Sequence, residues 1–290
     1  MGKLVVHNGD FVKPENLQIS LDNRAMNYAD GLFESIRVVN GKLYSFDDHF
    51  ARLEEGARIL KLDANFYQFK DILRLKASLL AERLFMHKGG KIKILIHRRA
   101  GGLYLPESNA IDYLITGETL HDNLFALNVT GLNVDVYTDY KKPIHPFSKY
   151  KFLAKELSVL ARIDAEEKGY DEALLVNTDD KIIEASSSNL FLVYDDNTIV
   201  TPGLDTGCLA GIMRMNVINA CIKLGLKVYE QPLTEELLLQ GKEIFLTNAI
   251  QGIRYVGSFK SKRYFKQVSE VILNAVNAQV RLAVKSDELF

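Results

Sequence analysis

The sequence predicts a protein of two α+β domains, and three observations lead to this fold class. The chain has 290 residues, which is long for one hydrophobic core and natural for two. Strand and helix signals are interspersed without the regular alternation of a doubly wound sheet. A polar, interrupted stretch lies between two regions that each contain both kinds of signal. We therefore expect a smaller domain at 1–116, a linker at 117–123 and a larger domain at 124–290.

The expected elements of the first region follow from turn and helix signals. Asn40-Gly41 lies between two apolar runs and is the strongest hairpin signal in the sequence. Asp47 can cap a helix that runs to about Leu60, with apolar side chains at helical spacing. The expected strands lie at 4–6, 35–39, 42–44, 91–97 and 111–115, and the expected helices at 47–60 and 68–84.

The second region is expected to begin with a strand-like run and a long helix. This helix should extend from about Lys149 to Lys168 and end at Gly169. Another helix should begin near Gly211 and end before Gly225. The other expected elements are strands at 126–137, 173–176, 181–183, 189–194, 228–229 and 244–247, and a terminal helix at 269–283.

The composition excludes several classes of protein. The hydrophobic fraction of 47% and the charged fraction of 25% are ordinary for a soluble globular protein. A formal net charge of −1 argues against nucleic acid or an anionic membrane as the main partner, because such surfaces attract a basic excess. No membrane-spanning run or secretory signal is recognisable. Two cysteines and six scattered histidines show no metal-ligand spacing, so we expect a cytoplasmic protein without a metal site.

Two segments of the second region could take part in chemistry, but neither decides a function alone. The glycine-bearing loop at 207–211 precedes a predicted helix, whose free N-terminal amides could bind phosphate. Glycines that only permit a tight turn are the more common explanation of such a loop. Glu184 stands at the end of a predicted strand, where an acid is usually a solvated loop charge.

The local sequence pattern does not decide the role of the candidate lysine and arginine residues either. Lys151 lies in a lysine-rich stretch, which alone indicates a solvated basic face. Lys155 lies nearly opposite the apolar stripe of the predicted helix and should be on the surface, but periodicity does not select Lys151. Arg52 alone would be taken as an exposed helix arginine paired with Glu55 or Asp48. The apolar stripe consists of Leu153, Leu157, Leu160 and Ala161.

Together these segments resemble the class IV aminotransferase family, which includes branched-chain and D-amino acid aminotransferases and aminodeoxychorismate lyase. The resemblance spans nearly the whole chain, and its strongest motif is EASSSNLF at 184–191. The other motifs are YADGLFESIR at 28–37, HFARL at 49–53, GYDEA at 169–173, GIMR at 211–214 and TNA at 247–249. The resemblance implies the two-domain fold of D-amino acid aminotransferase (fold type IV), pyridoxal 5'-phosphate (PLP) as cofactor and a homodimer.

The resemblance also implies roles for individual residues. By register against Gly169 and Glu172, Lys151 is the lysine that carries PLP as a Schiff base. Glu184 is the acid that keeps the ring nitrogen protonated, so that the ring withdraws electrons from the substrate. Branched-chain enzymes have a tyrosine where Glu156 stands, so the partner of the ring's phenolic oxygen is not identified.

Phosphate binding is assigned by the same resemblance. It falls to Arg52 and to the backbone amides of Ile212 and Met213. Relatives often have a threonine where Ala249 stands, so that contact is absent or comes from Thr247 or Asn248.

One further residue is a candidate for substrate binding. Lys93 stands where branched-chain enzymes use an arginine, and it is a weak candidate for binding a substrate carboxylate. A solvent-facing lysine on an alternating strand explains it equally well.

Two reactions stay open at this point. The slightly favoured reaction is a PLP-dependent transfer of an amino group between an amino acid and a 2-keto acid, because most of the family are transaminases. A branched-chain amino acid is a candidate for the donor. Aminodeoxychorismate lyase, which releases pyruvate and 4-aminobenzoate, is the alternative, and the motifs at 211–214 and 248–249 look closer to it. An Arg-x-His pair is missing from 98–106, which disfavours D-amino acids. A non-catalytic small-molecule-binding protein is a remote alternative, because both Lys151 and Glu184 are present.

Overall fold

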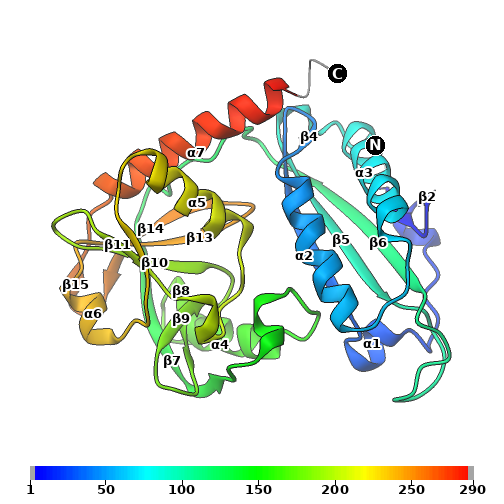
Figure 1. The fold of residues 1–290 in the computed structure, drawn as a ribbon, viewed down its shortest axis with the longest axis horizontal. Helices are drawn as coiled ribbons and strands as arrows, with labels where there is room; N and C mark the ends of the chain where they lie inside the picture. The colour runs from blue at the N-terminus through cyan, green and yellow to red at the C-terminus, as the bar shows by residue number, and fades with distance from the viewer. Residues whose placement is uncertain (1–3, 287–290) are drawn as a thin grey trace. The chain divides into compact units, whose positions relative to one another are not determined.

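The computed structural model describes residues 4–286, and these form two compact units (Figure 1). Unit 1 contains the described residues up to Leu124, the segment Tyr150–Ala154 and the C-terminal helix from Val280. Unit 2 contains Phe125–Lys149 and Lys155–Gln279. Both units mix helices with sheet, which confirms the α+β class. The expected boundaries differ from this grouping, because the linker expected at 117–123 begins inside a strand and Lys151 groups with the smaller, N-terminal unit.

Unit 1 is built on a six-stranded sheet in the order β2-β1-β6-β5-β3-β4, with every neighbouring pair antiparallel. Two long helices, α2 and α3, pack against this sheet. The strands are β1 (Val5–His7), β2 (Asp10–Val12), β3 (Gly31–Val39), β4 (Lys42–Leu43), β5 (Gly90–Arg98) and β6 (Ile111–Thr119). The helices are α1 (Arg24–Tyr28), α2 (Phe46–Ile59) and α3 (Phe66–Arg83), with 3-10 turns at Pro14–Asn16 and Met86–Lys88.

Local sequence signals explain most of unit 1. Asn40 and Gly41 both have positive φ, 49° and 78°, as the tight turn between β3 and β4 requires. The isoleucines at 92, 94 and 96 are all buried, so the alternation expected for this strand is confirmed. The cap expected at Asp47 is wrong, because Ser45 precedes α2. Asp47 instead lies in the first turn and forms ion pairs with Lys70 and Arg74.

Unit 2 contains a nine-stranded sheet whose main path is β12-β11-β10-β13-β14-β7-β8-β9, with β15 paired to β14. An additional pairing joins β9 to β10, so the strands from β10 to β9 form a closed ring. The strands are β7 (Leu132–Lys142), β8 (Glu172–Asn177), β9 (Ile182–Ala185), β10 (Asn189–Val193), β11 (Ile199–Thr201), β12 (Val228–Glu230), β13 (Glu243–Asn248), β14 (Gly252–Phe259) and β15 (Lys262–Arg263). The helices are α4 (Glu156–Glu167), α5 (Ile212–Lys223), α6 (Glu235–Gln240) and the part of α7 (Gln267–Ser286) before Val280, with 3-10 turns at Pro146–Lys149 and Leu204–Thr206.

The helix expected from Lys149 to Lys168 is wrong over its first seven residues. The helix α4 begins only at Glu156, and residues 150–154 are extended along β3. Tyr150 belongs to the hydrophobic core of unit 1 and Phe152 packs against it, so tertiary packing overrides the local helix pattern. The apolar stripe is also different: Ala161 and Ala165 are buried, whereas Leu160 is exposed. The argument that helical phase puts Lys155 on the surface therefore does not hold.

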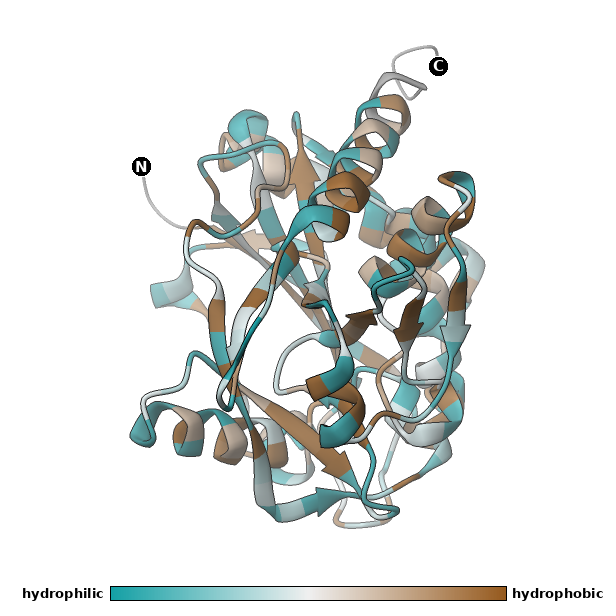
Figure 2. Ribbon diagram, turned by 90° about the vertical axis from the view of Figure 1, so that its left-hand side faces the viewer, coloured by the Kyte–Doolittle hydropathy of each residue, from teal (hydrophilic) through white to brown (hydrophobic). Residues whose placement is uncertain are grey.

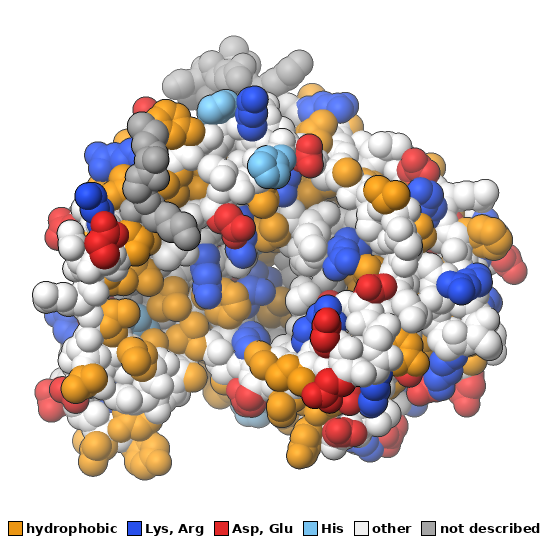
Figure 3. Space-filling view, turned by 180° about the vertical axis from the view of Figure 1, so that it is seen from behind, with side chains coloured by type: hydrophobic (Ala, Val, Ile, Leu, Met, Phe, Trp, Pro, Cys, Tyr) orange, Lys and Arg blue, Asp and Glu red, His pale blue; other side chains and the backbone are white. Residues whose placement is uncertain are grey.

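Hydropathy and charge are distributed as in a folded globular protein. Figure 2 shows mainly hydrophobic strands and helices that alternate between hydrophobic and hydrophilic residues. Figure 3 shows acidic and basic side chains interspersed over the visible face, as the net charge of −1 leads us to expect. Within residues 4–286, no helix is both long enough and apolar enough to cross a bilayer.

Candidate active site

Lys151 lies in the extended segment of unit 1, beside β3. The backbone amide of Phe33 donates to the Lys151 carbonyl at 3.0 Å, and the amide of Leu153 donates to the Gly31 carbonyl at 3.1 Å. These bonds hold the backbone from Lys151 to Leu153 against β3. The Lys151 Nζ atom lies 4.8 Å from the centre of the Phe33 ring, within the range of a cation–π contact.

Lys93 shares this aromatic ring with Lys151. The Lys93 Nζ atom lies 4.7 Å from the centre of the Phe33 ring, and Lys93 projects from the neighbouring strand β5. Burial lowers the pKa of the Lys93 ammonium, and the charge of Lys91 lowers it further. The structure thus brings the two lysines together around one ring, and Lys93 is half-buried rather than fully solvent-facing.

Arg52 belongs to a buried charged cluster between α2 and β3. Its Nε and Nη2 atoms donate to the two carboxylate oxygens of Glu34 at 2.8 and 2.6 Å. The His49 Nδ1 atom lies 2.7 Å from Glu34 Oε2. Burial alone would raise the pKa of Glu34, but the charge of Arg52 and the contact with His49 hold it at about 2. The exposed arginine paired with Glu55 or Asp48 is therefore the wrong explanation of Arg52.

The carboxylate of Glu184 is buried at the end of β9 in unit 2. Its Oε1 atom lies 2.5 Å from Lys142 Nζ, and its Oε2 atom accepts a hydrogen bond from the Leu209 amide at 2.8 Å. The side chain of Asn189 donates to the Leu209 carbonyl at 2.7 Å, which ties the loop before α5 to β10. Glu184 is thus a fixed, paired acid and not a solvated loop charge.

The N-terminus of α5 follows this loop. Gly211 is its N-cap and makes no side-chain cap, and Ile212 and Met213 are its first two helical residues. The amides of a helix's first turn have no acceptor within the helix, so they are available to an anion. A Cβ atom on Gly211 would lie 2.0 Å from Asn189 Oδ1, so the close approach of this loop to β10 requires a glycine.

A third segment of unit 2 contains a polar atom that has no partner among residues 4–286. The Thr247 Oγ1 atom, at the end of β13, is buried and makes no hydrogen bond there. Leaving a buried hydroxyl unpaired costs about 1–3 kcal/mol, so this atom fits a site completed by a polar ligand group. The next residue, Asn248, donates to Ser188 Oγ at 3.1 Å and Gln251 Oε1 at 2.9 Å. These bonds join the turn that contains Ala249 to the loop after Glu184.

Sequence reasoning missed three residues of these clusters. Glu34 and His49 stand inside the recognised motifs, but no role was given to either. The signal for Glu34 was its place among the apolar residues of a predicted strand, where a buried acid needs a partner. Lys142 belongs to the lysine-rich stretch before Lys151, and nothing in the sequence indicates that it pairs with Glu184.

Comparison with known proteins identifies the family. The profile of the family described as Amino-transferase class IV matches residues 31–259. The chain belongs to this family, so it is an enzyme of the PLP-dependent aminotransferase class, and the resemblance and cofactor expected from the motifs are confirmed.

Several curated relatives match most of the chain. It is 28% identical to a putative branched-chain-amino-acid aminotransferase of Methanocaldococcus jannaschii, over 83% of this chain and 82% of that protein. It is 28% identical to the D-alanine aminotransferase of Bacillus licheniformis, over 84% of each chain. It is also 26% identical to the aminodeoxychorismate lyase of Vibrio harveyi, over 84% of this chain and 88% of that protein.

A solved structure shares the fold over nearly its whole length. The branched-chain aminotransferase of Thermoproteus uzoniensis, crystallised with norvaline, superposes with a TM-score of 0.83 at 23% identity. The match covers 97% of this chain and 95% of that one. The fold expected from the motifs, that of fold type IV, is thereby confirmed.

Proposed function

We propose that the chain is an aminotransferase that moves an amino group between an amino acid and a 2-keto acid, with PLP held by Lys151 and Glu184. One observation carries the assignment of these residues. Glu184 presents a buried carboxylate whose position is fixed by Lys142 Nζ and the Leu209 amide. A fixed negative charge of this kind suits the protonated ring nitrogen of PLP.

Lys151 is the residue proposed to bind the cofactor covalently. Its ammonium group lies over the Phe33 ring, and its backbone is held against β3 through the Lys151 carbonyl and the Leu153 amide. The same amine would remove the proton at the substrate Cα and return it later. Lys149 and Lys155 are the alternatives, but both belong to unit 2, at the end of a 3-10 turn and at the N-cap of α4.

Glu184 is proposed to act by charge. When bound, PLP supplies an electron sink for the negative charge that develops at the substrate Cα. Glu184 would favour the protonated ring nitrogen on which that property depends, because its carboxylate is buried and held by two donors.

Phosphate binding is proposed for Arg52, the amides of Ile212 and Met213, and the segment of Asn248 and Ala249. The uncapped helix N-terminus of α5 supports this role, because its first amides need an acceptor. The Thr247 hydroxyl, which has no hydrogen-bond partner among residues 4–286, supports it too, and it would replace the threonine that relatives often have at Ala249. The amides at the start of α5 and the Thr247 hydroxyl, both in unit 2, are donors of the kind that a phosphate group needs.

Lys93 is proposed to bind a substrate carboxylate. The support is its place beside Lys151, around the ring of Phe33. Partial burial also removes water that would otherwise compete for its ammonium group. A branched-chain amino acid is the proposed donor, since the names of several relatives specify such substrates.

Aminodeoxychorismate lyase is the second candidate function. The similarity to the lyase of Vibrio harveyi supports it, together with the motifs at 211–214 and 248–249. Both reactions need Lys151 and Glu184, so these two residues do not discriminate between them. We further propose a homodimer and a cytoplasmic location, as the resemblance and the composition predict.

One assay panel tests the function and the lysine assignment together. The purified protein should absorb visible light as a PLP enzyme does, and borohydride reduction followed by peptide mapping should label Lys151. Branched-chain amino acids with a keto-acid acceptor should give product, whereas aminodeoxychorismate should not. Release of 4-aminobenzoate would favour the lyase, and a label on Lys149 or Lys155 would contradict the assignment of Lys151.

A further inference from the structure

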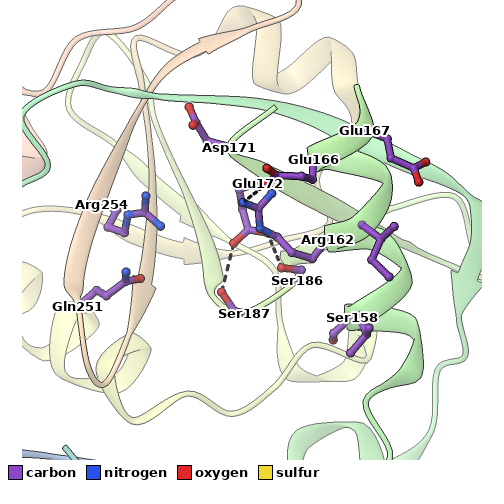
Figure 4. A pocket seen from close by; sticks show the side chains of 12 residues that line it. Ser158, Arg162, Glu166, Glu167, Asp171, Glu172, Ser186, Ser187, Gln251 and Arg254 are labelled. Atoms are coloured by element: carbon purple, nitrogen blue, oxygen red, sulfur yellow. Dashed lines mark hydrogen bonds and ion pairs between the residues drawn. The ribbon is translucent and has the colours of Figure 1, made fainter. Parts of the chain in front are cut away.

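A buried carboxyl group in unit 2 lies beside the turn that follows Glu184, and it has no cation as partner (Figure 4). It belongs to Glu172, the first residue of β8, whose exposed fraction is 3%. None of residues 4–286 forms an ion pair with it. An acid is rarely buried to this degree without a cation, because burial removes its hydration. The burial of Glu172 therefore calls for a different reason.

Neutral donors of the β9–β10 turn (residues 186–188) take the place of a cation. The hydroxyl groups of Ser186 and Ser187 donate to Oε1 and Oε2 of Glu172, the second at 3.1 Å. The amide of Ala173 also donates to Oε1, at 3.0 Å, which fixes the carboxyl group relative to β8. Figure 4 shows both serine side chains directed towards Glu172. One carboxyl group thus holds two consecutive residues of the turn.

Side-chain packing does not hold the turn from this side. Glu172, Ser186 and Ser187 all border a pocket of about 770 Å³, so the serine side chains have few apolar neighbours there. The backbone of the turn is tied to β8 by one further bond, from the Ser186 amide to the Ala173 carbonyl at 3.0 Å. The hydrogen bonds to Glu172 are therefore a large part of what fixes the turn against β8.

The strand pairing before the turn is irregular, which makes this support more important. The register of β8 with β9 shifts directly before Glu184, so that Ile183 is skipped. An extra residue of this kind disrupts the ladder and changes the direction of the side chains next to it. The position of the Glu184 carboxylate consequently depends on the turn that follows it as well as on the ladder.

The residue after the turn completes the connection to Glu184. Asn189 stands opposite Glu184 where β9 pairs with β10, and its side chain donates to the Leu209 carbonyl at 2.7 Å. The Leu209 amide donates to Glu184 Oε2 at 2.8 Å. A displaced turn would therefore move both Glu184 and the residue that orients its amide donor.

We propose that Glu172 is a positioning residue, which holds the β9–β10 turn so that the Glu184 carboxylate stays aligned with the ring nitrogen of PLP. The inference rests on the proposed role of Glu184, and Glu172 acts through that residue without touching the cofactor. It acts by hydrogen bonding and not by charge, because its three donors are two hydroxyl groups and an amide. A displacement of about 1 Å in such an alignment can lower a rate roughly 100-fold.

The first experiment separates hydrogen bonding from charge in the holoenzyme at saturating PLP. Glu172→Ala removes the bonds to both serines and should lower kcat by roughly 10- to 100-fold, while KM for the amino donor changes by less than about threefold. Glu172→Gln removes the charge but keeps an acceptor oxygen and an NH2 group that can bond to the other serine. Its kcat should stay within about threefold of wild type.

A matched control shows what loss of stability alone does. Glu243 is a second buried acid of unit 2, at the start of β13, and it accepts hydrogen bonds from the amides of Val268 and Ser269. Glu243→Gln places an NH2 group against one of these amides, so it should lower the melting temperature. Its kcat should nevertheless equal that of the wild type below that temperature.

A double-variant cycle tests whether Glu172 acts through Glu184. In the Glu184→Gln background no carboxylate is left to align, so Glu172→Ala should lower the single-turnover rate by less than about a further threefold. The variant with both Ser186→Ala and Ser187→Ala removes the same bonds from the other side and should behave like Glu172→Ala. It keeps the cycle decisive if Glu172→Ala does not fold.

Three results would overturn the proposal: wild-type kcat in Glu172→Ala or in the serine variant, a loss in Glu172→Gln as large as that in Glu172→Ala, or equal fold losses with and without Glu184. Failure of the proposed function looks different. The wild type would then lack visible absorbance or turnover with every amino donor, or Glu184→Gln alone would keep wild-type turnover.

Discussion

The candidate residues of the two units are held by different means. In unit 1 the acid, the histidine and the arginine of the Glu34–His49–Arg52 cluster stand on regular elements and pair with one another. In unit 2 the candidate contacts come mainly from the backbone. The Leu209 amide donates to Glu184, Gly211 allows its loop to approach Asn189 closely, and the first turn of α5 has free amides. Unit 1 should therefore be sensitive to changes of charge, and unit 2 to small changes of volume. Glu184 is the exception in unit 2, since its charge itself is proposed to act.

The largest effect is expected for Glu184→Gln. The variant should still bind PLP, because the amide has a similar shape, but turnover should fall by several powers of ten, at about 1.4 kcal/mol for each. Substrate affinity should change far less than the rate. Steady-state kinetics together with the absorption spectrum measures both. A variant that turns over within a few-fold of wild type would make Glu184 a structural acid only.

Replacement of Arg52 comes next and tests whether unit 1 depends on charge. Arg52→Ala leaves Glu34 buried without its cation and should lower the free energy of unfolding by about 3–5 kcal/mol. Arg52→Lys restores a positive charge beside Glu34 but loses the bidentate contact. This variant should fold, but its affinity for PLP should be roughly tenfold lower than that of the wild type. Denaturant titration and PLP dissociation measure the two effects separately. Wild-type PLP affinity in the lysine variant would exclude Arg52 from phosphate binding.

Low pH should destabilise the fold through the Glu34–His49–Arg52 cluster. The pKa of Glu34 in the folded protein is about 2, below its ordinary value of 4.5, so its stabilising effect is complete above pH 4.5. That effect, about 3 kcal/mol, is lost as the pH falls from 4.5 towards 2. Chemical denaturation at a series of pH values should show this loss in the wild type and a smaller one in Glu34→Gln. Identical pH profiles would mean that the cluster does not stabilise the fold.

Gly211→Ala tests the dependence of unit 2 on volume. The added Cβ atom would lie 2.0 Å from Asn189 Oδ1, while φ of −68° at Gly211 suits alanine, so the effect is purely steric. Overpacking of this kind costs about 1–3 kcal/mol. Asn189→Ala removes the clashing atom, so the double variant should lose less than the sum of the single ones. Thermal unfolding measures the three variants, and strict additivity would contradict the clash.

The smallest effect is expected for Lys142→Met. In the apoprotein this change removes the cation beside Glu184 and should cost about 1 kcal/mol, because the Lys142 side chain is only partly buried and the Leu209 amide still donates to Glu184. In the holoenzyme the protonated ring nitrogen would supply a positive charge in its place, so the cost should be smaller. Unfolding of both forms with and without PLP checks this. An equal cost in the two forms would argue against a ring nitrogen beside Glu184.

Local patterns were sufficient for much of the fold but not for the segment around Lys151. The alternation in β5 and the Asn40-Gly41 turn depend on neighbouring residues, and both were predicted correctly. Residues 150–154 have a helical composition, yet they pair with β3, more than a hundred residues earlier in the chain. The strand β14 was missed because glycines and an arginine interrupt its apolar pattern.

Contacts between distant parts of the chain could not be predicted for the candidate site either. Resemblance selected Lys151, Glu184 and Arg52, whereas their partners came only from the structure. Glu34 and Arg52 stand on different elements, 18 residues apart, and Lys142 and Glu184 are 42 residues apart. No periodicity connects positions at such separations.

The closed ring of unit 2 has a consequence for how the protein is made. The strand β7 pairs with β14, which leaves the ribosome more than a hundred residues later. Until then β7 and β13 each present an unpaired edge, although β8, β9 and β10 can already associate locally. The surroundings of Glu184 can thus form early during synthesis, while the ring stays open and prone to aggregation until β14 arrives. A chain cut before Gly252 should consequently be captured by chaperones, even though it contains Lys151 and Glu184.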